Sequence, residues 1–278
     1  GDVTTGSVNR ICEGHEINEY YLQENYYGSG QYFDSDGKVL PNGGPTDGMI
    51  RTPKDMEWLN AMIAEGYKFM PKETVSKNGI WYGDYVLSDV NGDGIYGDSN
   101  DYKWQGVSRT PKFYYGFNLE VGWKGINLSA RFVGAGGGAI RSRKGGVNYS
   151  VLQTQQTIGK DIAYDHYFYD PDNPWDPRTN TTSRNPRLTI TYGQALNDSN
   201  FYLYKTNYLK LQNVTLSYSF PKKLLSHIRL TSAQIYVTGE NLYTFKDRLF
   251  PGVDPEFTDT NMYYSPIRQI VFGVNLKF

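Results

Sequence analysis

The sequence predicts an all-β fold, in which long antiparallel strands form a segment of a transmembrane β-barrel. The first observation is compositional: 25 tyrosines and 30 glycines among 278 residues favour strands, turns and amphipathic surfaces over helices. The second is a strict alternation of apolar and polar residues in several segments. The third is the length of these segments, roughly 10 to 14 residues, which exceeds the ~5 to 6 usual in soluble sheets and suits a tilted membrane crossing.

Five segments are predicted as strands on this basis. The last of them reads "IRQIVFGVNLKF" and places five apolar side chains on one face, namely Ile270, Phe272, Val274, Leu276 and Phe278. The predicted strands cover about 112–124, 126–136, 203–220, 232–245 and 267–278. The remaining chain is predicted as long loops over about 17–110, 137–202 and 246–266.

The connections between these strands are unequal in length. Lys124-Gly125 is predicted as a tight hairpin turn in which glycine supplies the positive φ. A change of apolar parity within 203–220 predicts a β-bulge around Gln212 and Asn213. Short turns at one end of a sheet and long loops at the other are typical of outer-membrane barrels. Inside the loops, helices are predicted over about 52–66 and within 139–165.

The charge balance and the cysteine content exclude several classes of protein. With 28 basic and 29 acidic residues there is no global field for nucleic acid. The single cysteine, Cys12, has no partner for a disulfide within the chain and belongs to no cysteine metal motif. A mean hydropathy of −0.59 accompanies the lack of any apolar run of the ~20 residues that a membrane helix requires. The first residues show none of the features of a signal peptide.

The segment "SDVNGDGIYGDSND" carries the sharpest local motif. Its first half matches an EF-hand-type calcium loop, with oxygen ligands at alternate positions and a glycine at the sharp turn. The predicted calcium ligands are Asp89, Asn91, Asp93, the carbonyl of Ile95, Asp98 and Asp101. The closing carboxylate is one place out of step, because Asn100 occupies position 12. A turn built from Asp, Asn and Gly, without any ion, explains the same residues.

A second candidate site lies in the aromatic and acidic segment "YDHYFYDPDNPWDP". His166, Tyr167, Tyr169 and Trp175 are predicted to stack on sugar rings or to pack against a peptide or a covering partner protein. The alternative is a loop stiffened by proline whose aromatic side chains pack on one another. Catalysis has little support, because His15, His166 and His227 are scattered and no pair of carboxylates is singled out by spacing. No enzyme activity is therefore predicted.

Taken together, several stretches resemble the C-terminal part of TonB-dependent outer-membrane transporters of the SusC/RagA family. They are "EGHEINEYY" (13–21), "GDYVLSDVNGDG" (83–94), "TPKFYYGFNLEVGWKGINLSARFVG" (110–134), "YLKLQNVTLSYSFPKKLL" (208–225), "IYVTGENLYTF" (235–245), "FPGVDPEF" (250–257) and "IRQIVFGVNLKF" (267–278). Their order and spacing resemble those of the family over nearly the whole chain. Asp101 lies one place late compared with the family's loop, which is a departure from the pattern.

The resemblance implies a barrel of 22 strands, of which this chain supplies the last quarter or so. It implies a plug domain, a segment that contacts TonB and a signal peptide before Gly1, and these are expected to be missing from the chain. The implied partners are outer-membrane lipid, the TonB complex and a surface lipoprotein of the SusD type, with oligosaccharides or peptides as substrates. Phe278 resembles the terminal aromatic residue that the barrel-assembly machinery recognises.

Two functions from different classes are therefore weighed. The first is part of an active importer, with Trp123, Phe132, Phe272 and Leu276 facing lipid and Asn118, Glu120, Arg131, Asn275 and Lys277 facing the lumen. The alternative is a soluble, secreted β-sandwich that binds carbohydrate and carries structural calcium. The strand faces discriminate between them, because a sandwich buries Phe113, Tyr115, Phe117 and Trp123 against a second sheet whereas a barrel exposes them.

Overall fold

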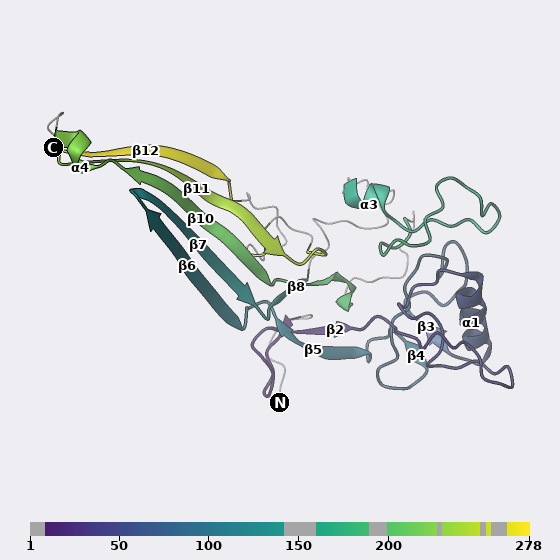
Figure 1. The fold of residues 1–278 in the computed structure, drawn as a ribbon. Helices are drawn as coiled ribbons and strands as arrows, with labels where there is room; N and C mark the ends of the chain where they lie inside the picture. Colours follow the sequence, from purple (N-terminus) through teal and green to yellow (C-terminus); the bar gives the residue numbers. More distant parts are fainter. Residues whose placement is uncertain (1–8, 142–159, 189–198, 227–229, 251–253, 257–265) are drawn as a thin grey trace. The chain divides into compact units, whose positions relative to one another are not determined.

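The computed structural model describes residues 9–141, 160–188, 199–226, 230–250, 254–256 and 266–278. The chain divides into two compact units, which Figure 1 shows as a long sheet and a body of loops with short elements. The sheet unit comprises Val107–Ile140 and Tyr204–Phe278, and the loop unit comprises Gly1–Gly106 and Arg141–Leu203. None of the described helices combines the length and the apolar character needed to cross a membrane.

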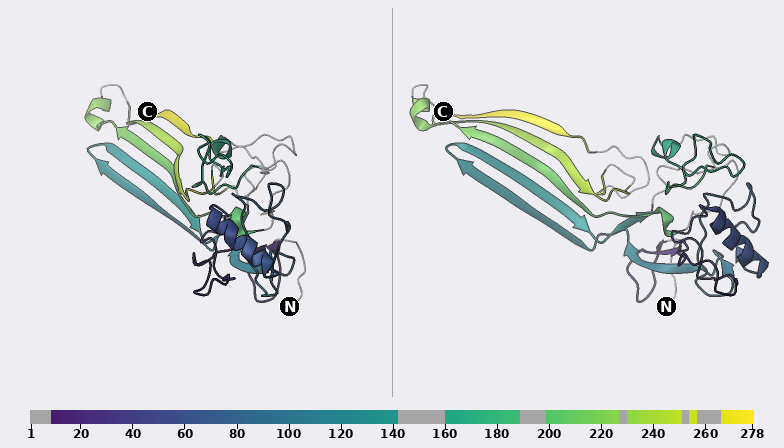
Figure 2. Two further views of the ribbon diagram at one scale, coloured as in Figure 1. Left: turned by 90° about the vertical axis from the view of Figure 1, so that its right-hand side faces the viewer. Right: turned by 45° about the vertical axis from the view of Figure 1, so that its right-hand side comes forward.

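The sheet unit is built on five long antiparallel strands in the order β12-β11-β10-β7-β6 (Figures 1 and 2). Their bounds are β6 (Phe113–Trp123), β7 (Ile126–Gly136), β10 (Tyr208–Ser219), β11 (Ser232–Lys246) and β12 (Gln269–Lys277). The predicted all-β, antiparallel fold class is confirmed. The described strands form an open sheet, in which β6 and β12 are the two edges.

The register of the sheet gathers apolar side chains on one face. One row runs across all five strands through Val121, Leu128, Leu216, Val237 and Phe272, each paired with the next. Because neighbouring residues of a strand point to opposite faces, the same register places every second residue of each strand on this face. We call it the apolar face.

The opposite face is polar and carries side-chain hydrogen bonds between strands. Asn127 donates to Glu120 at 2.9 Å, and the hydroxyls of Thr215 and Thr238 lie 2.8 Å apart. Lys210 also lies on this face, with only 2% of its surface exposed. Its ammonium group binds Asp254 at 2.7 Å and Glu256, so a segment of the connection between β11 and β12 is fixed to this polar face by charge.

A β-bulge in β10 keeps the two faces consistent along the whole strand. The register with both neighbours shifts between Leu211 and Asn213, as the change of apolar parity predicted. Leu211 before the bulge and Val214 after it therefore lie on the same face, although they are an odd number of positions apart. Without the bulge, half of β10 would present its leucines to the polar face.

Both short connections lie at one end of the sheet. The turn between β6 and β7 has positive φ at Lys124 (46°) as well as at Gly125 (87°), the geometry of a type I′ hairpin. The prediction assigned positive φ to the glycine alone. The short helix α4 (Lys222–Leu225) lies between β10 and β11, and Ser219 N–H donates to the Gly125 carbonyl at 2.8 Å.

The loop unit holds most of the elements outside the large sheet. They are β1 (Asn9–Arg10), β2 (Glu19–Gln23), α1 (Pro53–Ala64), β3 (Lys68–Phe69), β4 (Ile95–Tyr96), β5 (Tyr102–Ser108), α3 (Lys160–Tyr164) and the 3-10 turn η1 (Asn200–Tyr202). β5 runs two residues into the sheet unit, and β8 (Ala139–Arg141) pairs with β9 (Leu203–Lys205) where the chain passes between units. The described residues of the stretches predicted as long loops over about 17–110 and 137–202 thus include short helices and strands together with buried side chains such as Leu22, Trp58 and Tyr167.

Helix α1 anchors this core and begins where the sequence predicts. Thr52 caps it, and Asp55 completes a capping box by accepting from the Thr52 backbone N–H. Trp58, fully buried, donates from its indole N–H to the Leu40 carbonyl at 3.0 Å. In the predicted helical stretch 139–165 the structure has α3, while residues 142–159 lie outside the described part.

Candidate functional site

A pocket of about 830 Å³ in the loop unit brings together three of the four aromatic residues that the sequence singled out. His166, Tyr167 and Tyr169 line it, whereas Trp175 does not and is 92% exposed. The other lining residues are Lys77, Trp81, Tyr82, Ala163, Tyr164, Phe168, Asp170, Pro177, Arg178, Thr179, Asn180, Arg187 and Leu188. The walls therefore come from the two stretches 77–82 and 163–188, which are far apart in sequence.

Two of the predicted contact residues, Tyr167 and His166, bind neighbouring backbone groups and so stabilise the wall of the pocket. Tyr167 is fully buried, and its hydroxyl donates to the Arg51 carbonyl at 2.5 Å. Burial raises the pKa of Tyr167, so its phenol stays protonated as a donor. His166 has its ring Nδ1 3.0 Å from the Ile162 carbonyl. The pocket wall is thus fixed by these two side chains, and Tyr169 packs edge-on against Tyr82 at a centroid distance of 5.0 Å.

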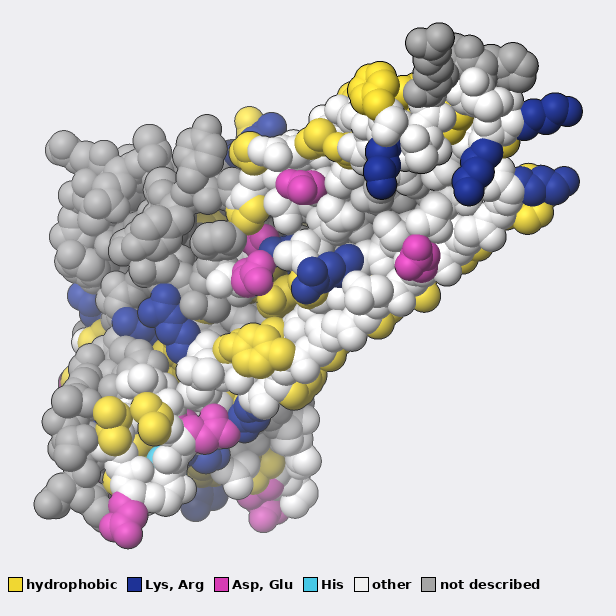
Figure 3. Space-filling view, turned by 90° about the vertical axis from the view of Figure 1, so that its left-hand side faces the viewer, with side chains coloured by type: hydrophobic (Ala, Val, Ile, Leu, Met, Phe, Trp, Pro, Cys, Tyr) yellow, Lys and Arg dark blue, Asp and Glu magenta, His cyan; other side chains and the backbone are white. Residues whose placement is uncertain are grey.

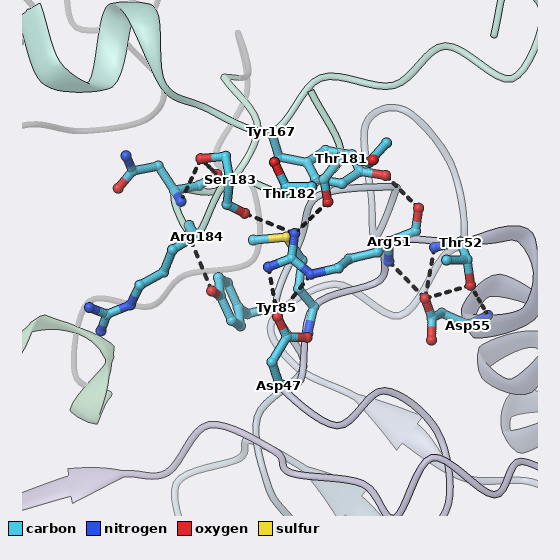
Figure 4. A network of polar contacts seen from close by, with 12 residues as sticks. Asp47, Arg51, Thr52, Asp55, Tyr85, Tyr167, Thr181, Thr182, Ser183 and Arg184 are labelled. Atoms are coloured by element: carbon cyan, nitrogen blue, oxygen red, sulfur yellow. Dashed lines mark hydrogen bonds and ion pairs between the residues drawn. The ribbon is translucent and has the colours of Figure 1, made fainter. Parts of the chain in front are cut away.

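Arg51 holds the pocket segment in place (Figure 4). Its guanidinium donates to the carbonyls of Thr181 and Ser183, both at 2.8 Å. Asp47 fixes the same guanidinium from the other side, with Nη2 to Oδ2 at 2.6 Å. Hydrogen bonds to a charged group are stronger than neutral ones, so this cluster ties the segment near 181–183 to the start of α1. The sequence gives no signal for this contact, because its partners are about 130 residues apart.

A second arginine, Arg187, joins the two stretches of chain that form the pocket. Arg187 binds Asp84 through two parallel hydrogen bonds of 3.0 and 2.9 Å, and donates further to the carbonyls of Lys77 and Gly79. Asp84 is only 3% exposed, and burial raises the pKa of its carboxyl while the Arg187 guanidinium opposes that rise. Asp84 lies in the "GDYVLSDVNGDG" stretch.

The charges around the pocket are largely satisfied by one another. Arg178 pairs with Asp176 at 2.7 Å, and this hydrogen-bonded pairing lowers the pKa of Asp176 to about 2. The Arg178 guanidinium also lies over the Phe168 ring, 4.7 Å from its centroid. What the pocket offers to a ligand is therefore aromatic surface with amide, hydroxyl and guanidinium groups around it, which is suited to binding.

The predicted calcium loop is held together by its own backbone. The Asp89 carboxylate accepts from the N–H groups of Gly92 (2.7 Å) and Gly94 (2.8 Å). The Asp93 carboxylate accepts from Ile95 N–H at 2.9 Å. These are the hydrogen bonds of turns in which an Asp side chain caps the following backbone. The loop thus takes its shape from turns of the kind that Asp, Asn and Gly residues form.

Asp101 has a role that the sequence did not indicate. It is fully buried, and its carboxylate accepts from four backbone N–H groups: Val90 (2.6 Å), Gly97 (2.7 Å), Asp98 (3.1 Å) and Asn91 (3.4 Å). Burial raises the pKa of Asp101, and these four donors oppose the rise. Asp101 closes the loop from inside, which accounts for its displaced position relative to a calcium motif.

Within the described residues, no group of three or more His, Cys, Asp or Glu side chains is arranged to hold a metal ion. Asp98 is directed to its own turn, where it accepts from Asn100 N–H at 2.7 Å. Calcium binding by this loop stays a prediction, as does the assembly role of Phe278. That residue follows β12 directly and is 86% exposed.

Comparisons with known proteins agree with the architecture. The chain is 29% identical over 210 residues to TonB-dependent receptor P3 of Formosa agariphila, covering 70% of this chain and 19% of that protein. It is 26% identical over 187 residues to TonB-dependent receptor P26 of the same organism, covering 67% and 17%. A solved structure of the RagAB peptide transporter matches its fold with a TM-score of 0.55 and 23% identity, over 73% of this chain and 22% of the other. No family model matches the chain.

The chain spans about a fifth of the length of the curated relatives that it matches. Both curated relatives are named as TonB-dependent receptors, which agrees with the prediction that the chain carries no enzyme activity.

Replacing Asp101 with asparagine should loosen the 89–101 loop. The amide keeps the shape of the side chain but directs donors at backbone N–H groups that need an acceptor, at a cost of about 1–3 kcal/mol. Hydrogen exchange of the amides of Val90 and Gly97 should accelerate in Asp101→Asn. The control is Asp98→Asn at a partly exposed position of the same loop. Equal exchange in both variants would contradict a special role for Asp101.

The calcium prediction is checked by the same measurement on the unaltered protein. Calcium bound through Asp89 and Asp93 should slow exchange of the amides around Gly94, compared with protein kept in a chelator. The slowing should vanish in the double variant Asp89→Asn, Asp93→Asn. Identical exchange with calcium and with chelator would leave the loop as a turn held by backbone hydrogen bonds alone.

Proposed function

We propose that this chain, which is part of a TonB-dependent receptor of the SusC/RagA type, forms barrel wall and folded loops of an outer-membrane nutrient importer. The importer works with a surface lipoprotein of the SusD type and takes up glycan oligomers or peptides, with TonB driving transport. The proposal extends from the chain to the whole protein, and three features of the described structure support it.

The observation that carries the proposal is the exposure of the apolar face. Phe272 is 79% exposed, Trp123 66% and Val274 63%, and no second sheet covers this face within the described residues. Soluble monomers rarely leave so large a continuous apolar surface uncovered. The sandwich alternative requires four aromatic side chains of β6 to be buried. Their exposed fractions are instead 55% for Phe113, 43% for Tyr115, 46% for Phe117 and 66% for Trp123. Hydrocarbon is the solvent that suits this face.

Aromatic side chains mark the two ends of the apolar face. Trp123 and Tyr218 lie near the short connections, while Phe113, Tyr115 and Tyr243 lie toward the other end. Phe113 and Trp123 are the first and last of the 11 residues of β6. At about 3.3 Å per residue and a tilt near 40°, this separation corresponds to about 25 Å along the membrane normal. Aromatic girdles flanking an apolar band of that height are typical of outer-membrane barrels.

The polar face and the open edges complete the argument. Asn118, Glu120, Arg131, Asn275 and Lys277, which were predicted to face a lumen, all lie on the face opposite Trp123, Phe132, Phe272 and Leu276. Edge strands β6 and β12 each pair with one described neighbour. In a membrane their free backbone groups need further strands, so the proposed barrel closes through strands beyond those described here.

The pocket in the loop unit is the proposed contact site for substrate or for the lipoprotein lid. Its aromatic surface with surrounding hydrogen-bonding groups suits either sugar rings or peptide side chains. The solved structure of similar fold is that of a peptide transporter, which supports keeping peptides beside glycans as substrates.

Placing a charge on the apolar face should block membrane assembly. Val274→Arg puts the charge toward lipid and should cost about 2–4 kcal/mol if the position is near the midplane, whereas Asn275→Arg puts it on the polar face and should be tolerated. The measurement is the fraction of whole transporter in outer membranes that shows heat-modifiable migration in gels. The two residues are adjacent in β12, so chain position and charge are matched. Equal assembly of both variants would contradict the assignment of faces.

Removing an aromatic side chain from the pocket should weaken uptake. Trp81→Ala should lower the uptake of the responsive ligand by roughly three- to tenfold, because an aromatic contact contributes about 0.5–1.5 kcal/mol. The probes are labelled peptide mixtures and labelled oligosaccharide mixtures, offered separately to cells that carry the whole transporter.

Trp175→Ala is the matched control, since this tryptophan lies outside the pocket lining. Trp81→Phe should restore much of the uptake. Loss of uptake with Trp175→Ala but not with Trp81→Ala would shift the contact site from the pocket to the exposed 170–176 segment.

A further inference from the structure

The end of the sheet with the short connections is strongly basic. Lys124 lies in the turn between β6 and β7, and Lys222 and Lys223 lie in α4 between β10 and β11; all three are exposed. The two connecting segments, residues 123–126 and 219–226, contain no aspartate or glutamate. We call these three lysines the lysine rim. Figure 3 shows basic side chains gathered at this end of the strands, away from the nearest acidic ones.

The register places the lysine rim along one edge of the membrane-facing surface. Ser219 N–H donates to Gly125, so α4 begins beside the turn that carries Lys124. Strands are spaced by about 4.8 Å, so the three ammonium groups spread over only a few strand widths. Basic side chains this close together create a local positive potential that is stronger than the net charge of the chain suggests.

Apolar side chains beside the lysine rim indicate that it lies at the surface of the membrane. The Lys124 ammonium lies 4.7 Å from the ring centroid of Trp123, which belongs to the apolar face. Leu224, between the α4 lysines and the buried Leu225, is 56% exposed. Tryptophan and lysine side chains with an apolar body and a polar tip favour the level of lipid headgroups. The lysine rim thus continues the apolar face to the depth where phosphate groups lie.

We infer that the lysine rim binds the phosphate groups of anionic phospholipids in the leaflet next to the short connections. The inference rests on the proposed function, because it requires the apolar face to lie in a membrane. It goes beyond that function by assigning lipid specificity to three residues of this chain. Each basic side chain near a membrane surface adds attraction for anionic lipid, and together the three should favour phosphatidylglycerol over phosphatidylcholine by about fivefold or more.

The test uses Trp123 as a reporter of the lipid beside Lys124. The whole transporter is reconstituted in nanodiscs that contain phosphatidylcholine together with either brominated phosphatidylglycerol or brominated phosphatidylcholine, because bromine quenches a neighbouring tryptophan. Subtracting the signal of Trp123→Phe isolates this residue from the other tryptophans. The expected result is several-fold stronger quenching by brominated phosphatidylglycerol, which disappears in the triple variant Lys124→Gln, Lys222→Gln, Lys223→Gln.

The matched control removes three exposed lysines from the loop unit, Lys38→Gln, Lys54→Gln and Lys68→Gln, with the same change in net charge. This control should keep the preference for phosphatidylglycerol. Equal quenching by both brominated lipids in the unaltered protein, or a preference that survives the triple variant, would overturn the inference while leaving the membrane placement intact. A Trp123 signal that neither brominated lipid quenches would overturn the proposed function as well.

Discussion

The sheet unit depends on one constraint, which is that side chains alternate between the two faces of a strand. The apolar residues of all five strands therefore lie on the same face and are exposed to the same surroundings. Across the row from Val121 to Phe272, every pairing places an apolar group beside another. The bulge after Leu211 exists because the sequence of β10 changes parity, and any other register would mix the two faces. The hydrocarbon of a membrane suits this surface better than water does, so the pairing and the exposure together support the proposed membrane placement.

A different physical device organises the parts outside the long strands. Three cations, each from one segment, hold polar groups of another: Arg51 and Arg187 in the loop unit, and Lys210 on the polar face of β10. The pairs Arg187–Asp84 and Lys210–Asp254 are buried, and removing one partner of a buried pair is strongly destabilising because it leaves the other charge uncompensated. The long connections are therefore held at a few positions by charged side chains. Two of these side chains, Arg51 and Arg187, hold the segments that form the aromatic pocket.

The sequence predicted the features that depend on residues close together in the chain, and it did not predict contacts between residues far apart in the chain. The strands, the Lys124-Gly125 turn and the bulge depend on neighbours a few positions away, as does the Thr52 cap, so their patterns are visible in the chain. The clamp of Arg51 on the carbonyl of Ser183 joins residues about 130 positions apart and has no local pattern. Asp101 was predicted as a calcium ligand from spacing alone, because its four backbone donors appear only once the loop is folded. The resemblance of the chain to TonB-dependent transporters could be recognised in the sequence because it rests on many such local patterns in a fixed order.

Two tyrosine–glycine pairs show one use that the sheet makes of these two residues. The Tyr115 ring lies over Gly134 on the neighbouring strand, and the Tyr236 ring lies over Gly273, so that any side chain at either glycine would collide with the ring. A ring that covers a glycine on the next strand protects its backbone hydrogen bonds and fills the space that a missing side chain leaves. Tyr115 does this on the apolar face and Tyr236 on the polar face, and the Tyr115 hydroxyl still reaches the Tyr208 carbonyl at 2.8 Å. Tyrosine suits both surfaces because it combines apolar area with one polar atom, and at these two places its ring fills the space that the glycine on the next strand leaves open.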